Sequence, residues 1–148
     1  MDQPVKMLLL DANLVDREWQ MLSKMLDPAL KYAVGRIDSA DVLAAVKGGT
    51  SMLLAVMLNG RMSALLVVEG NQYPRRRVFN VALCAGSDLS TWAPQIWVQL
   101  QQFAISLGFD QIEVTGRPGW IKFLPGAKEV YRGCVMDLNP NLVIAEAS

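Results

Sequence analysis

The sequence contains no histidine, and this absence restricts the chemistry that the chain can perform. Without an imidazole to take the proton from a hydroxyl or thiol, the Ser-His-Asp and Cys-His arrangements of nucleophilic catalysis are excluded. Most catalytic zinc sites are excluded as well, and the two cysteines, Cys84 and Cys134, cannot complete a tetrahedral zinc site by themselves. We therefore expect no metal site, and hydrolase and metalloenzyme functions are disfavoured.

The basic residues of the chain are balanced by its acidic residues, with 14 of each. A protein that binds nucleic-acid phosphates normally carries a basic excess, so a nucleic-acid partner is not expected. The densest basic cluster is Arg75-Arg76-Arg77, which we interpret as the solvated start of a strand. Nucleic-acid binding through this cluster is only a third alternative for the function.

Apolar residues make up 52% of the 148 residues, and charged residues only 19%. A chain of this length fits one domain, which we place at 1–138, with a C-terminal tail at 139–148. The apolar surplus has to be buried, which predicts self-association or a protein partner.

The sequence carries no segment that predicts membrane insertion. The apolar run Met7–Leu10 is far shorter than the ~20 residues that cross a bilayer, and no small-residue cleavage site follows it. Both cysteines lie in apolar, strand-like segments, which is typical of buried thiols in a reducing compartment. The expectation is a cytoplasmic protein with no membrane partner.

The first fifty residues predict one strand and two helices. Val5–Leu10 is the strand candidate, and apolar residues recur at helical spacing from Leu14 until Pro28, so the first helix should end or kink near Asp27. Asp38-Ser39 is a capping sequence for a second helix, which Gly48-Gly49 ends.

Three consecutive strands are predicted in the middle of the chain. Two nearly continuous apolar runs, 51–58 and 62–68, are separated by Asn59-Gly60, a strong signal for a tight hairpin. A turn over 70–74 precedes a third strand over 77–83, in which Phe79, Val81 and Leu83 should share one face. These three strands form an antiparallel centre of the sheet.

The last third predicts a long helix, a short strand, a short helix and a final strand. The long helix follows the capping cluster Ser87–Thr91 and ends at Gly108. After it come a strand over 112–115, a helical turn or two over 120–124, and a last strand or bent strand pair over 129–138.

This order of elements resembles the GNAT superfamily of N-acyltransferases. Two segments of the last third also resemble GNAT sequence motifs. In the first, Leu107-Gly108-Phe109-Asp110-Gln111-Ile112-Glu113-Val114, a helix ends in Gly and a strand follows; the second is 120–130. The resemblance implies an α/β (α+β) fold with a mixed sheet, a long helix after the third central strand, and a short C-terminal helix and strand. The chain is also similar to a GNAT-like protein encoded by bacteriophages and prophages near head-assembly genes.

The phosphate-binding loop of the superfamily is the main departure. GNAT enzymes hold the CoA pyrophosphate with a Gln/Arg-x-x-Gly-x-Gly/Ala loop before the long helix, whereas segment 84–92 has one glycine, no basic residue and an acid, Asp88. We interpret Asp88 as a helix cap that would repel a pyrophosphate. If CoA binds, the resemblance implies contacts with main-chain groups of Leu83, Ala85, Gly86 and Ser87.

Many GNAT enzymes also use a Tyr of the short last helix to protonate the leaving thiolate, and segment 120–124 has none. A general base would have to be a carboxylate on the central strands, and the candidates are Glu69 and Glu113; the alternative for both is an ordinary solvated acid. Arg117 and Trp120 are candidate binding residues for an anion or a partner carboxylate, or else packing residues at the sheet edge.

Two functions of different classes follow. The missing loop and Tyr favour a degenerate GNAT-fold protein without a cofactor that acts through protein contacts, in phage assembly, in the virion or on the host. Such a protein would lie in the host cytoplasm or the virion. The alternative is an active acyl-CoA-dependent N-acyltransferase that binds acetyl-CoA or another acyl-CoA with an atypical loop.

Overall fold

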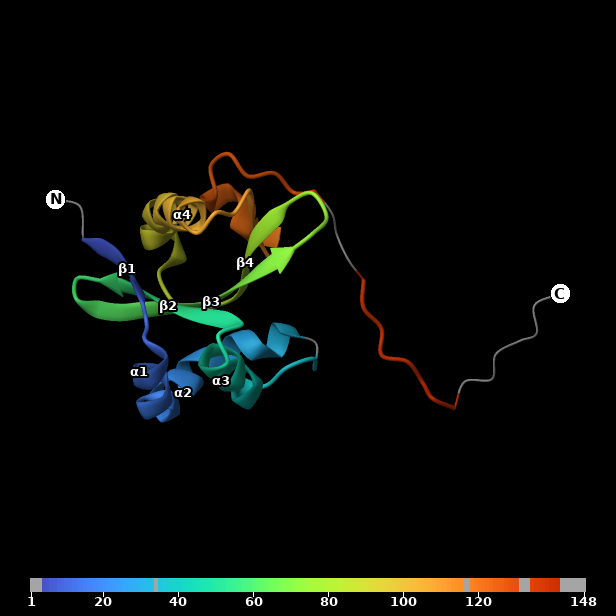
Figure 1. The fold of residues 1–148 in the computed structure, drawn as a ribbon. Helices are drawn as coiled ribbons and strands as arrows, with labels where there is room; N and C mark the ends of the chain where they lie inside the picture. Colours follow the sequence, from blue (N-terminus) through green and yellow to red (C-terminus); the bar gives the residue numbers. More distant parts are fainter. Residues whose placement is uncertain (1–3, 34, 116–117, 131–133, 142–148) are drawn as a thin grey trace.

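The computed structural model describes residues 4–33, 35–115, 118–130 and 134–141. Its centre is a five-stranded sheet in the order β1-β2-β3-β4-β5 (Figure 1). The strands are β1 Val5–Leu9, β2 Ser51–Leu58, β3 Arg61–Gln72, β4 Arg77–Gly86 and β5 Gln111–Val114. Neighbours from β1 to β4 are antiparallel, and β5 is parallel to β4, which confirms the mixed sheet.

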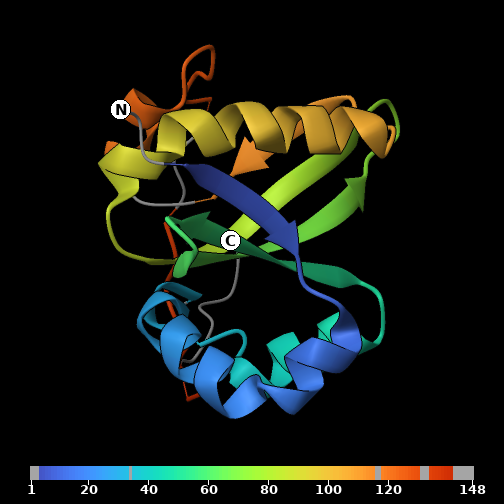
Figure 2. The ribbon, with the colours of Figure 1, turned by 90° about the vertical axis from the view of Figure 1, so that its left-hand side faces the viewer.

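Helices cover both faces of the sheet (Figure 2). One face carries α1 Ala12–Arg17, α2 Trp19–Leu30 and α3 Ser39–Lys47, and the other carries α4 Leu89–Ser106. Short 3-10 helices, η1 Lys31–Ala33 and η2 Pro118–Phe123, follow α2 and β5. The apolar residues form two clusters, one under α4 and one under α1–α3, so the sheet is buried on both sides.

The helix predicted to end or kink near Asp27 does not end there but continues through Pro28 to Leu30, and a break comes earlier, at Glu18 between α1 and α2. Pro28 lies in the last turn, where the missing N–H removes a single helical hydrogen bond, and Ala29 beside it is buried. The start of α3 is confirmed as a capping box: the Asp38 and Asp41 carboxylates each accept the other residue's backbone N–H at 3.0 Å.

The hairpin at Asn59-Gly60 is confirmed, because both residues have positive φ, 52° and 76°. The next turn lies later than predicted. β3 continues to Gln72, and the turn spans Tyr73–Arg76, where the Tyr73 N–H donates to the Arg76 carbonyl at 2.9 Å. Cross-strand pairing with 77–80 therefore extends the strand through Gly70.

A β-bulge in β4 changes which side chains share a face. Val68 pairs with Val81 and Val67 pairs with Leu83, so Ala82 is an extra residue in β4. Phe79 and Val81 consequently pack under α4, whereas Leu83 packs under α1–α3. The predicted common face of these three residues is wrong for Leu83.

The final strand predicted over 129–138 is not formed by the described residues of this segment. Figure 1 shows residues 134–138 away from the sheet, and the apolar side chains Met136 and Leu138 are 78% and 83% exposed. These side chains contact no core, so nothing favours pairing with the sheet.

Candidate functional site

The sheet opens between β4 and β5. The two strands pair from Val78 opposite Gln111 to Val81 opposite Val114, and the last link is a hydrogen bond from the Thr115 N–H to the Val81 carbonyl at 3.1 Å. β4 continues to Gly86, and no described residue forms a strand along this side of 82–86. The opening therefore exposes the edge of a central strand to a ligand.

The bulge at Ala82 decides which main-chain groups face this opening. Val81 directs its carbonyl toward β5, and main-chain groups alternate sides along a strand. The extra residue shifts that alternation, so Leu83 and Ala85 point their main-chain groups at β3 while Cys84 and Gly86 point theirs at the opening. The Ser87 N–H likewise donates to the Ser63 carbonyl of β3.

Cofactor binding by Leu83, Ala85, Gly86 and Ser87 thus stays a prediction. Among these four residues, only Gly86 directs its main-chain N–H toward the opening. Cys84, which was not among the predicted residues, also directs its main-chain groups there. The sequence could not indicate which of these residues face the opening, because a bulge is a property of the pairing between two strands.

A polar row crosses the sheet one residue before the end of the β4–β5 pairing. Glu69 on β3 pairs with Asn80 on β4, and Asn80 pairs with Glu113 on β5, so the two predicted carboxylates flank one amide. The Asn80 Nδ2 donates to the Glu69 Oε1 at 3.3 Å, and the Thr115 Oγ1 donates to the Asn80 Oδ1 at 3.2 Å. Strand spacing separates the Cα atoms of the two glutamates by roughly 10 Å.

This row begins where the core under α1–α3 stops. Leu65 and Val67 on β3 and Leu83 on β4 belong to that core, and Glu69 and Asn80 are the next positions on the same face. Glu69 is half-buried and Asn80 is buried. A half-buried carboxylate oriented by an amide can accept a proton from a group bound beside it.

Asn80 is the functional candidate that sequence reasoning missed. The available signal was an amide within the apolar stretch Val78-Phe79-Asn80-Val81, where a buried polar side chain requires hydrogen-bond partners. Those partners come from β3 and from the end of β5, and no local pattern specifies which residues stand opposite Asn80.

The start of α4 differs from the prediction for Asp88. Asp88 occupies the N-cap position with φ 61° and ψ 35°, but its side chain makes no capping hydrogen bond. In this left-handed conformation the carboxylate lies beside the Ser87 Oγ at 3.4 Å instead. The N–H groups of Leu89 and Ser90 have no acceptor within the described ranges, as is typical of a helix start.

An open groove of about 630 Å³ lies beside the start of α4. Its lining comes from the β2–β3 hairpin and the first turn of the helix: Leu58, Asn59, Arg61, Ser63, Asp88 and Thr91. Arg61 supplies a positive charge that segment 84–92 lacks, and it forms no ion pair with another described residue. The Arg61 charge, the α4 N-terminus and the hydroxyls of Ser63 and Thr91 are groups that attract a phosphate. Asp88 is the one lining residue whose charge repels it.

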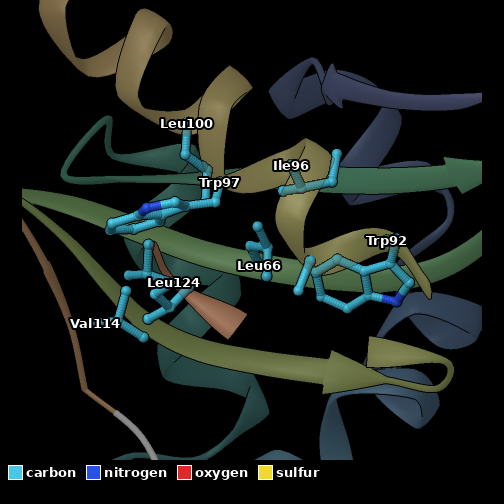
Figure 3. Close-up of a pocket in the computed structure, with 9 residues that line it drawn as sticks. Leu66, Trp92, Ile96, Trp97, Leu100, Val114 and Leu124 are labelled. Atoms are coloured by element: carbon cyan, nitrogen blue, oxygen red, sulfur yellow. The ribbon is translucent and has the colours of Figure 1, made fainter. Parts of the chain in front are cut away.

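The interior end of the opening is filled by apolar side chains (Figure 3). A cavity of about 10 Å³ remains, enough for roughly one water, between Val81 and Val114 on the strands, Trp92 and Trp97 on α4, and Leu124 after η2. The Trp97 indole N–H donates to the Pro125 carbonyl at 2.8 Å and holds this segment in place.

No protein-family model and no curated protein sequence matches the chain. Solved structures do match. An aminoglycoside acetyltransferase, meta-AAC0020 from an uncultured soil metagenomic sample, superposes with a TM-score of 0.63 at 13% identity, over 91% of this chain and 97% of that chain. A GNAT family acetyltransferase of Staphylococcus aureus gives a TM-score of 0.64 at 11% identity, over 90% of this chain and 98% of that chain.

The chain has the GNAT fold. A third GNAT-fold neighbour, the aminoglycoside N-acetyltransferase AAC(6')-Iy in complex with CoA, gives a TM-score of 0.60 at 14% identity, over 93% of this chain and 97% of that chain. These neighbours are named as acetyltransferases, and this finding contradicts the expectation of a non-catalytic protein acting through contacts in a phage. The finding favours the enzymatic alternative. The expectation that the protein has no cofactor is not supported.

The remaining site predictions concern residues after β5. Arg117 lies outside the described residues, and Trp120 is described only as part of the η2 backbone. Within the described ranges there is no cluster of three or more side chains that could hold a metal ion. No helix in that part of the chain is long and apolar enough to cross a membrane.

Proposed function

We propose that this GNAT-fold chain is an N-acyltransferase that moves an acyl group from acyl-CoA to the amine of a second substrate. The observation that supports this proposal most directly is the position of Glu69. Its carboxylate is bound by the buried Asn80, one residue before Val81, whose carbonyl makes the last hydrogen bond between β4 and β5. A proton acceptor on β3 therefore lies near the opening of the sheet.

The groove at the start of α4 supports the CoA part of the proposal. Arg61, the unpaired N–H groups of Leu89 and Ser90, and the Ser63 and Thr91 hydroxyls would hold the phosphates. Acyl-CoA, when bound, supplies a thioester carbonyl that an amine can attack. The Gly86 N–H faces the opening and can donate a hydrogen bond to an oxygen there.

Proton transfer is the step assigned to the polar row. As the new C–N bond forms and the C–S bond breaks, Glu69 accepts the proton that the amine loses, directly or through one water. The η2 sequence Pro118–Phe123 contains no tyrosine, so the departing thiolate would take its proton from solvent.

The surroundings of the row favour particular substrates. Glu69 and Glu113, on the two strands that flank β4, place two acidic groups in one row, which favours a cationic amine. Because two neighbours are named for aminoglycosides, these polyamines are the first acceptor class to test.

The test is acetyl transfer measured by mass spectrometry of the acceptor, which avoids thiol reagents that react with the exposed Cys134. We expect wild-type protein to acetylate at least one cationic amine in a panel of aminoglycosides, polyamines and peptide N-termini. Glu69→Gln should lower kcat by about 100-fold or more, because a general base contributes a factor of that order.

Glu18→Gln is the matched control, since Glu18 is an exposed carboxylate between α1 and α2 on no strand of the site. It should keep kcat within about twofold. Wild-type kcat in Glu69→Gln would contradict the role of Glu69, and no transfer to any amine of the panel would contradict the proposed function.

A further inference from the structure

We propose that Asn80 is a positioning residue that fixes the carboxylate of Glu69 at the opening of the sheet. This inference rests on the proposed function and adds a residue to it. Asn80 itself lies inside the sheet rather than at the opened edge, so it acts through Glu69.

The first argument is burial. Asn80 is 8% exposed and stands between Phe79 and Val81, which are 0% and 2% exposed. A buried amide is unfavourable unless both its donor and its acceptor are hydrogen-bonded. Both are bonded here, to Glu69 and to Thr115, so the side chain is held from two sides.

The second argument is the direction of the amide. A carboxylate only accepts hydrogen bonds, so the Asn80 NH₂ must face Glu69, and the Asn80 carbonyl is left to accept from the Thr115 hydroxyl. The orientation is therefore set by the chemistry of the two partners. Aspartate, of the same shape, would present an oxygen to Glu69 at a distance near 3.3 Å and would repel it.

The third argument is location. The Asn80 side chain links β3 to the residue after β5, one position before the last hydrogen bond that joins β4 to β5. A base that takes a proton from a bound amine has to be held within hydrogen-bond reach of it. Asn80 connects the carboxylate to the place where the strands part, so a loss of this link releases the base.

The experiment compares Asn80→Asp with Val78→Ala, a change at a buried apolar β4 residue that pairs with Asn71 and Gln111 rather than with the glutamates of the row. We expect Asn80→Asp to lower kcat by about tenfold or more while the KM for acetyl-CoA changes less than about twofold. Val78→Ala should lower the melting temperature and keep kcat of the folded protein within about twofold. An unchanged kcat in Asn80→Asp would overturn the proposal.

A double-mutant cycle separates positioning from a direct or purely structural role. If Asn80 acts through Glu69, Asn80→Asp should change the residual kcat of Glu69→Gln by less than about twofold. An equal loss of kcat in both backgrounds would overturn the proposal, because Asn80 would then act independently of Glu69.

A readout without catalysis keeps this inference distinct from the proposed function. In NMR spectra the Asn80 side-chain amide protons should exchange slowly with water, and Glu69→Ala should shift their signals and speed the exchange. If these changes occur but no amine is acetylated, the linkage stands and the proposed function fails. Signals that do not respond to Glu69→Ala would overturn the positioning role itself.

Discussion

At the residue scale, two glycines of β3 and β4 lie where an added Cβ would clash with neighbouring atoms. A Cβ at Gly86 would lie 2.3 Å from the Ser63 carbonyl oxygen and 2.6 Å from the Ala64 Cα, and its φ is 151°. A Cβ at Gly70 would lie 2.8 Å from the Phe109 ring, which packs edge-on against Phe79 at 5.5 Å. Gly86 therefore meets fixed backbone, whereas Gly70 meets a ring that can shift.

This difference predicts unequal effects of alanine. Gly86→Ala should reduce the free energy of unfolding by about 3 kcal/mol or more, because both the close contact and the positive φ are unfavourable. Gly70→Ala should reduce it by about 1 to 2 kcal/mol. Urea denaturation gives both values, and equal losses would show that β3 can move away from Gly86.

At the element scale, the arginine cluster is divided between two roles. The Arg77 guanidinium donates to the Gly108 carbonyl at 3.1 Å and to the Leu107 carbonyl at 3.4 Å, and it lies 4.8 Å from the centre of the Phe109 ring. Its charge thus stabilises the C-terminal end of α4. Arg75 lies exposed in the β3–β4 turn, as the prediction of a solvated cluster requires.

The two arginines should respond differently to the same substitution. Arg77→Met should lower the free energy of unfolding by about 1 to 2 kcal/mol, through the lost carbonyl and ring contacts. Arg75→Met should change it by less than about 0.5 kcal/mol. Thermal unfolding of both variants tests this, and equal stability would mean that the end of α4 does not depend on Arg77.

At the scale of the whole molecule, local signals were sufficient for the order of elements. Asn59-Gly60 and the Asp38 cap each specify one turn or helix start through their own backbone preferences. The long helix α4 is likewise indicated by its apolar spacing. These features combine into a fold that the solved acetyltransferases share.

Features that depend on pairing between distant segments could not be predicted. The extra residue Ala82 exists only relative to β3, and it reverses the faces of Leu83 and Ala85. The contacts of Asn80 join residues 11 and 35 positions apart in the chain, so the candidate site becomes visible only when three strands are aligned. Self-association, a protein partner and a cytoplasmic location stay predictions.

Calorimetric titration with acetyl-CoA tests the central claim most directly, because an acyltransferase of this fold must bind the donor despite its atypical loop. We expect saturable binding at micromolar concentration, weakened about tenfold or more in Arg61→Ala and unchanged in Arg75→Ala. The same ligand should raise the melting temperature of the wild-type protein. An absence of binding at millimolar acetyl-CoA would contradict the proposal that this chain is an acyltransferase.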